Sequence, residues 1–345
     1  MPINYEPIDT TTDVATTRTL LHEVIPLTGT IVSGTYGTFP NDDNIKNYSH
    51  GMFQSVYDYP YLSSSANHIF DLTAGFDESS PLSGSVSSVQ ETKKINMYNQ
   101  FSQVLLGYTG STNRVRLFES DLTLDEDSPM KETIFVNLSR LLTKDEIKKG
   151  SVSITLGTAS WAAPFGGVKT FTDADAAENA GTLNTIGGDY GILSSSTGVG
   201  GVIFYQAGVM VLTSSIWAGT TDFFSQSGTA RTFDNQLVSG SISGSADAFR
   251  HRLYNLQFNN TTEINSTVYF CRMPHNKFNY SSNPTYLNAG SIRVKNNSRN
   301  NPPISYITTV GLYNSQNELL AVAKLSEPLR KDPTNELTLR VRLDY

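Results

Sequence analysis

The last ten residues of the chain alternate strictly between two kinds of side chain, and this pattern constrains the fold more than any other feature. Successive side chains of a β-strand point to opposite faces of the sheet, so a period of two predicts a strand with one apolar and one polar face. Such a strand must bury its apolar face against other elements, which predicts a sheet with one packed side. The apolar positions are Leu337, Leu339, Val341, Leu343 and Tyr345, and the polar positions are Glu336, Thr338, Arg340, Arg342 and Asp344.

Two further strands are predicted just before this one. The segments "ISYITTVGLY" and "LLAVAKL" are strand-like, and "NSQNE" between them supplies turn residues. We therefore expect residues 301–345 to form a C-terminal β-meander that completes a sheet.

The composition favours a mainly β fold for the rest of the chain. Charged residues make up 17% of the 345 residues, below the usual share of about 25%, and Ser, Thr, Asn and Gly are abundant. Turn-rich β proteins have this composition. We predict an antiparallel β-sandwich or jelly-roll-like body with a few short helices and long Gly/Ser-rich loops. Residues 1–20 form an N-terminal arm, and residues 21–300 form the main β-rich body, with loop insertions at about 158–201 and 218–247.

Two helices are predicted inside this body. Apolar residues recur at helical spacing in "KKINMYNQFSQVLLGY", residues 93–108. A shorter helix is indicated in "LLTKDEIKKG", where Thr143 and Glu146 have the spacing of a capping box and Gly150 follows.

Charge and cysteine content exclude several classes of protein. The net charge is −7, which disfavours direct nucleic-acid binding because phosphate contacts need clustered Lys and Arg. Cys271 is the only cysteine, so no disulfide framework or cysteine zinc site is expected, and we predict a buried, apolar role for it. No signal peptide and no membrane-spanning segment is predicted, so we expect synthesis in a cytoplasm and no membrane insertion.

The histidines show no metal-ligand spacing. His50 and His68 share an aromatic region with Asp58 and Asp71, where a metal site or an acid–base pair is the alternative to structural, hydrogen-bonded histidines. We expect the structural role. The five histidines are His22, His50, His68, His251 and His275.

The acidic stretch "ESDLTLDEDSP", residues 119–129, raises the question of calcium. Asp121, Asp125 and Asp127 do not match the spacing of an EF-hand loop, so we predict a solvated loop without a metal ion. Gly198, Gly200 and Gly201 precede a strand-like run, whereas a dinucleotide fingerprint opens a helix. We therefore predict no cofactor.

No catalytic site is apparent. Cys271 and His275 lie four residues apart, but a nucleophile and its base are brought together by the fold and not by sequence spacing. Trp161 and Trp217 lie in or beside glycine-rich segments, where an exposed pair could bind a sugar. We expect instead that they anchor those segments or are buried at subunit contacts.

Several segments resemble a known class of proteins. The ending "SYITTVGLYNSQNELLAVAKLSEPLRKDPTNELTLRVRLDY" resembles that of virion structural proteins of large contractile-tailed bacteriophages, of the T4-like marine phage type, and its "ITTVGLYN…LLAVAKL" part is similar to β-modules of tail-fibre and collar proteins. The resemblance includes "RTLLHEVIPLTGTIVSGTY", "NYSHGMFQSVYDYPYLSSSANHIFDLTAGF", "KKINMYNQFSQVLLGY" and "LSRLLTKDEIKKGS", about half of the chain. These motifs contain no catalytic residues.

The resemblance implies a non-enzymatic structural subunit of a tailed-phage virion, in the tail, baseplate or neck. We expect a homo-oligomer that also contacts other virion proteins through loops and the arm, and that is made in the host bacterial cytoplasm. The alternatives are a receptor- or glycan-binding β-sandwich module that recognises host-surface glycan, and a capsid decoration protein. A hydrolase would need two carboxylates across a cleft, with Asp58, Asp71 and Glu78 as the candidates.

Overall fold

The computed structural model describes residues 5–28, 43–84, 88–110, 114–177, 181–226, 228–281, 287–288, 291–294 and 298–345. The chain divides into two compact units: unit 1 comprises Met1–Leu20 with Glu263–Tyr345, and unit 2 comprises Leu21–Thr262. Both boundaries fall inside long strands, β1 (Val14–Thr28) and β17 (Leu253–Met273). The C-terminal module therefore begins near residue 263 and not near 301, and residues 14–20 of the expected arm belong to a strand.

The chain is mainly β, as predicted, with 46% strand against 17% helix, and it has a sandwich-like body built on one large sheet. Neighbouring strands whose register is described are antiparallel. From one edge to the other the sheet contains β1, β17, β9 (Ser153–Gly157), β10 (Val168–Thr172), β12 (Gly188–Ser195), β13 (Gly198–Phe204), β14 (Val209–Thr213), β7 (Glu132–Leu138), β4 (His68–Phe76), β3 (Gln54–Tyr57) and β2 (Ile45–Asn47), with β8 (Glu146–Ile147) beside β17 and β11 (Thr182–Thr185) beside β12.

The centre of this sheet is buried on both faces, and each face has its own core. In β7, Val136 belongs to one hydrophobic cluster and its neighbour Phe135 to the other; in β14, Met210 and Val211 divide in the same way. This division follows from the alternation of side chains along a strand. Strands buried on both faces explain why "VIFYQAGVMVL" is almost continuously apolar.

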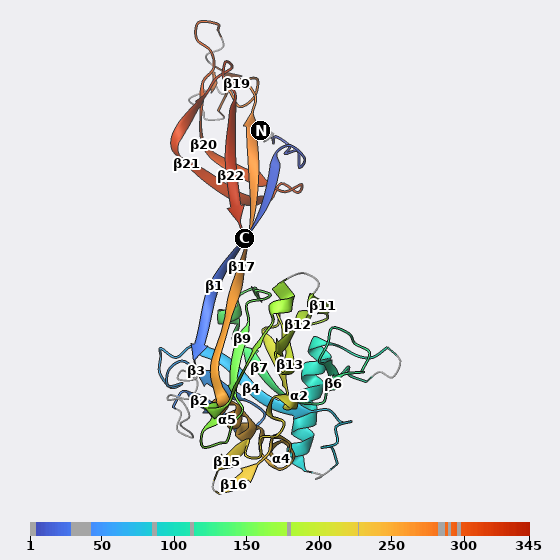
Figure 1. Ribbon diagram of the computed structural model, residues 1–345. Coiled ribbons are helices and arrows are strands. Elements are labelled where there is room, and N and C mark those ends of the chain that lie inside the picture. The colour runs from blue at the N-terminus through green and yellow to red at the C-terminus, as the bar shows by residue number, and fades with distance from the viewer. Residues whose placement is uncertain are drawn as a thin grey trace. The chain divides into compact units, whose positions relative to one another are not determined.

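Helices complete both cores of unit 2 (Figure 1). The longest, α2 (Val89–Leu105), confirms the helix expected at 93–108, although it begins four residues earlier and ends at Leu105. The Ser88 hydroxyl caps it by accepting a hydrogen bond from the Glu91 amide. Most of its buried apolar side chains join the cluster around Phe135, whereas α4 (Phe233–Ser239) and α5 (Ile242–Arg252) join the cluster around Val136. The smaller elements are α3 (Arg140–Thr143), η1 (Pro164–Gly166), η2 (Ala174–Ala177), η4 (Ser214–Trp217), β5 (Phe118–Glu119), β6 (Pro129–Met130), β15 (Phe224–Gln226) and β16 (Thr229–Arg231).

The two predicted loop insertions are wrong. Residues 158–201 contribute β10 to β13, and residues 218–247 contain β15, β16, α4 and the start of α5. The glycines that suggested loops are required inside the sheet by close packing. A Cβ at Gly200 would lie 2.4 Å from the Phe171 ring, and one at Gly191 would lie 2.2 Å from the Tyr205 hydroxyl.

The short helix predicted from the Thr143–Glu146 spacing is also wrong. The helix α3 ends at Thr143, and Glu146 begins β8, which pairs with β17. The Ile147 side chain is fully buried in the core, and its amide donates to the Tyr205 carbonyl oxygen at 3.0 Å. Burial of Ile147 and the backbone pairing therefore override the local helix signal.

Unit 1 consists of strands alone in its described part. The terminal strand β22 (Leu337–Asp344) pairs with β17 in antiparallel register, from Met273 opposite Leu337 to Ser266 opposite Asp344. The strands β20 (Ser305–Tyr313) and β21 (Leu319–Lys331) pair with each other as a two-stranded ribbon, as do β18 (Leu287–Asn288) and β19 (Ser291–Val294). The expected meander is therefore corrected: its first two strands form a hairpin, but the third pairs with β17.

Candidate functional site

The structure brings together only two of the four residues considered for an acid–base pair. His68 Nε2 lies 2.9 Å from Asp71 Oδ1, and the Ser55 hydroxyl donates to the same carboxylate. Asp58 accepts hydrogen bonds from the backbone and side-chain amides of Asn67 at 2.6 and 2.8 Å. The ring of His50 stacks on the ring of Tyr48, with centroids 5.2 Å apart. Both histidines are therefore held by contacts with neighbouring side chains.

No hydrogen bond joins the candidate nucleophile Cys271 to His275 in the described part of the chain. Cys271 is half-buried, whereas full burial was expected. This partial burial raises the pKa of its thiol, so at neutral pH the thiol stays protonated and is a poor nucleophile. His275 lies 3.1 Å from Glu336 on an exposed surface. Glu78 is exposed in the turn that follows β4.

The two tryptophans do not form an exposed pair. The Trp217 side chain is buried, stacks on Phe233 and donates its indole N–H to the Gly157 carbonyl oxygen at 3.2 Å. Trp161 is half-buried, and its ring stacks on His251 with centroids 4.2 Å apart. Both side chains anchor unit 2, so the platform that a tryptophan-based sugar site requires is absent from this pair.

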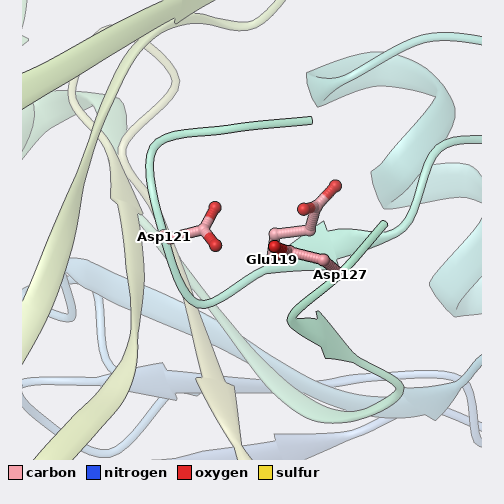
Figure 2. Close-up of side chains that lie close together, drawn as sticks. All are labelled: Glu119, Asp121 and Asp127. Atoms are coloured by element: carbon pink, nitrogen blue, oxygen red, sulfur yellow. The ribbon is translucent and has the colours of Figure 1, made fainter. Parts of the chain in front are cut away.

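The acidic stretch at 119–129 connects β5 to β6, and three of its carboxylates converge there (Figure 2). One carboxylate oxygen from each of Glu119, Asp121 and Asp127 lies within 4.8 Å of the other two. The Thr123 amide and hydroxyl hold Asp121 from one side, at 2.8 and 2.7 Å, and the Ser128 hydroxyl donates to its other oxygen. The Ser128 hydrogen bond holds the pKa of Asp121 below its usual range. Asp121 therefore stays ionised at neutral pH.

Glu119 differs from the other two carboxylates because it is almost completely buried. Only 3% of the residue is exposed, and burial raises the pKa of its carboxyl group. Its Oε1 accepts a hydrogen bond from the Glu126 amide at 3.1 Å, but its Oε2 has no hydrogen-bond partner in the described part of the chain. Sequence analysis did not consider Glu119 as a ligand. The available signal was its position directly after the apolar Leu117 and Phe118.

An exposed apolar surface lies on the ribbon of unit 1. We call it the ribbon patch and define it as Tyr5, Tyr313, Leu319 and Val322, whose exposed fractions lie between 37% and 51%. Tyr313 is opposite Leu319 and Val322 is opposite Gly311 in the pairing of β20 with β21. The Tyr5 ring packs edge-on against Tyr313, with centroids 4.9 Å apart. Sequence analysis did not single out this group.

Unit 1 lacks a hydrophobic core in its described residues. Both hydrophobic clusters consist of residues between Leu27 and Phe258. The buried apolar side chains of unit 1 that the structure describes are Val268, Met273, Leu312 and Val341, and each keeps at least 5% of its surface exposed. A compact unit of this size normally has its own core. The described part of unit 1 therefore leaves apolar side chains exposed, among them those of the ribbon patch.

No family model, no curated protein and no solved structure matches this chain. Among the described residues, no helix has both the length and the apolar character needed to cross a lipid bilayer.

Proposed function

We propose that this protein is a non-enzymatic structural subunit of a tailed-phage virion, in the tail, baseplate or neck, and that copies of it assemble through unit 1. The observation that carries the proposal is the absence of a core cluster from the described part of unit 1, together with the exposed ribbon patch. The resemblance of the C-terminal segment to virion structural proteins points the same way, and that segment lies within unit 1.

Further copies of the chain are the partner that best fits this surface. An isolated two-stranded ribbon is marginally stable in water and needs further strands or a packing face. In a symmetric oligomer every ribbon meets an equivalent ribbon, so one kind of contact covers the apolar surface of all copies. The strand β22 pairs with β17 on one side, and no other strand pairs with it among the described residues, so its second edge can also accept a strand from a neighbour.

The oligomeric state of the full chain tests the assembly. Size-exclusion chromatography with light scattering should give a multiple of 37.8 kDa. Replacing Leu319 and Val322 together by Glu should shift the protein toward the monomer, because like charges would face each other where apolar side chains were to be buried. The matched control replaces Leu62 and Leu141, which are 86% and 66% exposed in unit 2. A monomeric wild-type protein at micromolar concentration would refute the assembly.

Antibody labelling of purified phage particles tests the place of the protein. Gold particles confined to the tail, baseplate or neck in electron micrographs would support the structural role. If intact and disrupted particles both stay unlabelled, the virion proposal falls even when the protein is oligomeric in solution.

A further inference from the structure

The hairpin that connects β5 to β6 concentrates negative charge, and the two arginines that contact it, Arg114 and Arg116, bind Glu126 and the Leu124 carbonyl oxygen. Glu119, Asp121 and Asp127 approach one another within 4.8 Å, and Asp125 lies in the same loop. The nearby Arg114 forms its ion pair with Glu126 at 2.8 Å. Among the described residues, no ion pair involves any of the three converging carboxylates. Their mutual repulsion is therefore not offset by an ion pair in the described part of the chain.

The buried oxygen of Glu119 adds an independent reason to expect a ligand. Glu119 Oε2 is buried and has no hydrogen-bond partner, although its carboxylate belongs to the converging group. A buried polar atom without a partner is unfavourable, and a buried unpaired carboxylate is more so. Figure 2 shows the three carboxylate groups close together at the mouth of the hairpin. A cation held between them would bring a positive charge to the buried Glu119 carboxylate and remove the repulsion.

We propose that Glu119, Asp121 and Asp127 bind a calcium ion. All three ligands are carboxylate oxygens, which hard cations prefer, and no nitrogen or sulfur ligand belongs to the group. Calcium takes about six to eight oxygen ligands in flexible geometry, whereas magnesium demands a near-ideal octahedron and is usually bound through only one or two carboxylates. A group of three carboxylates therefore fits calcium better.

The site is partly organised in advance. Hydrogen bonds from Thr123 and Ser128 fix both oxygens of Asp121, and the Glu126 amide orients Glu119. The Tyr190 hydroxyl donates to the carbonyl oxygens of Asp121 and Thr123 at 3.2 and 3.3 Å, which ties the loop to β12. Asp127 is exposed, so water can complete the coordination from that side. The calcium site shares no residue with the ribbon patch, so either proposal can fail without the other.

Calorimetric titration of the full chain with calcium chloride, after removal of metal with a chelator, tests the site directly. We expect one calcium ion per chain with a dissociation constant below about 1 mM. Asp127→Asn should weaken binding by about tenfold or more because it removes an exposed ligand charge and leaves the fold intact. Asp125→Asn is the matched control, since it removes the same charge from the same loop outside the converging group and should change the affinity less than about threefold.

Three outcomes would overturn the proposal. Wild-type protein that shows neither heat nor a shift of its thermal midpoint in millimolar calcium has no such site. Equal weakening by Asp127→Asn and Asp125→Asn would mean diffuse attraction of cations to an acidic loop. Binding of magnesium as tight as that of calcium would contradict the ion assignment. Tryptophan fluorescence checks that each variant is folded, because both tryptophans are in unit 2 with the site.

Discussion

At the scale of single residues, three buried cations are held mainly by carbonyl oxygens. Arg252 donates to the carbonyl oxygens of Ala159 and Asp222 at 2.7 and 2.9 Å, and Lys331 donates to that of Asp332 at 2.9 Å. Lys94, which is fully buried, donates to the carbonyl oxygens of Leu237 and Gly240 at the C-terminal end of α4. The negative end of the helix dipole lies there, so the ammonium group is favourably placed despite its burial.

Lys94 gives a pH-dependent prediction. Burial lowers the pKa of its ammonium group from 10.5 to about 8, so between these values the unfolded chain binds more protons than the folded one. The free energy of unfolding should therefore rise with pH from about 8 toward 10.5, by at most about 1.4 kcal/mol per unit. Urea unfolding followed by tryptophan fluorescence at several pH values measures the slope, and Lys94→Met should remove it. The neighbouring half-buried Lys93, replaced by Met, is the control; equal slopes in wild type and Lys94→Met would contradict the prediction.

At the scale of elements, α2 and β4 touch through a glycine. A methyl group at Gly75 would lie 2.6 Å from the Lys94 carbonyl oxygen and 3.0 Å from the Tyr98 amide nitrogen, both backbone atoms of α2. The helix can approach the strand closely only because this position has no side chain.

Gly75→Ala should therefore push α2 away from β4. We expect a loss of about 1–3 kcal/mol in the free energy of unfolding of unit 2, the usual cost of overpacking, measured by urea denaturation. Gly110→Ala is the matched control, because a Cβ at Gly110 would have no neighbour within 4 Å. If the two variants have similar free energies of unfolding, α2 can move away from β4 with little loss of stability, and the prediction is wrong.

At the scale of the whole molecule, the two units differ in how much core they have. Unit 2 contains both hydrophobic clusters, and unit 1 has none in its described part. The stability of unit 2 therefore depends on its own packing, whereas that of unit 1 is expected to depend on association between copies.

Thermal unfolding should consequently occur in two steps. Both tryptophans lie in unit 2, so their fluorescence reports that unit alone, while far-ultraviolet circular dichroism reports the strands of both units. We expect an earlier transition seen by circular dichroism that moves upward with protein concentration. For a dimer, the free energy of unfolding rises by about 1.4 kcal/mol for each tenfold increase in protein concentration. The fluorescence transition should not move. A single coincident transition at all concentrations would contradict this difference between the units.

Local periodicity in the sequence was sufficient for several elements. The alternation of apolar and polar residues at the C-terminal end correctly predicted the strand β22. Its apolar side chains are less exposed than the polar ones between them, as the alternation implies; they are Leu337, Leu339, Val341 and Leu343. The helical spacing of apolar residues in 93–108 correctly predicted the helix α2, which spans Val89–Leu105. Both signals depend on residues close together in the chain, so they can be recognised without knowledge of the tertiary structure. Mainly β structure also followed from the composition of the whole chain.

Contacts between segments far apart in the sequence decided the strand pairing and the arrangement of the candidate calcium site. Glycines such as Gly200 suggest a loop by composition, and only packing against Phe171 places them in a strand. The partner of β22 is β17, about 70 residues earlier, and no local signal selects it over β21. Glu119 likewise resembles any exposed acid until the fold buries its carboxylate beside Asp121 and Asp127. Side-chain periodicity is a property of one segment, whereas strand pairing, burial and the convergence of charges depend on which distant segments the folded chain brings into contact.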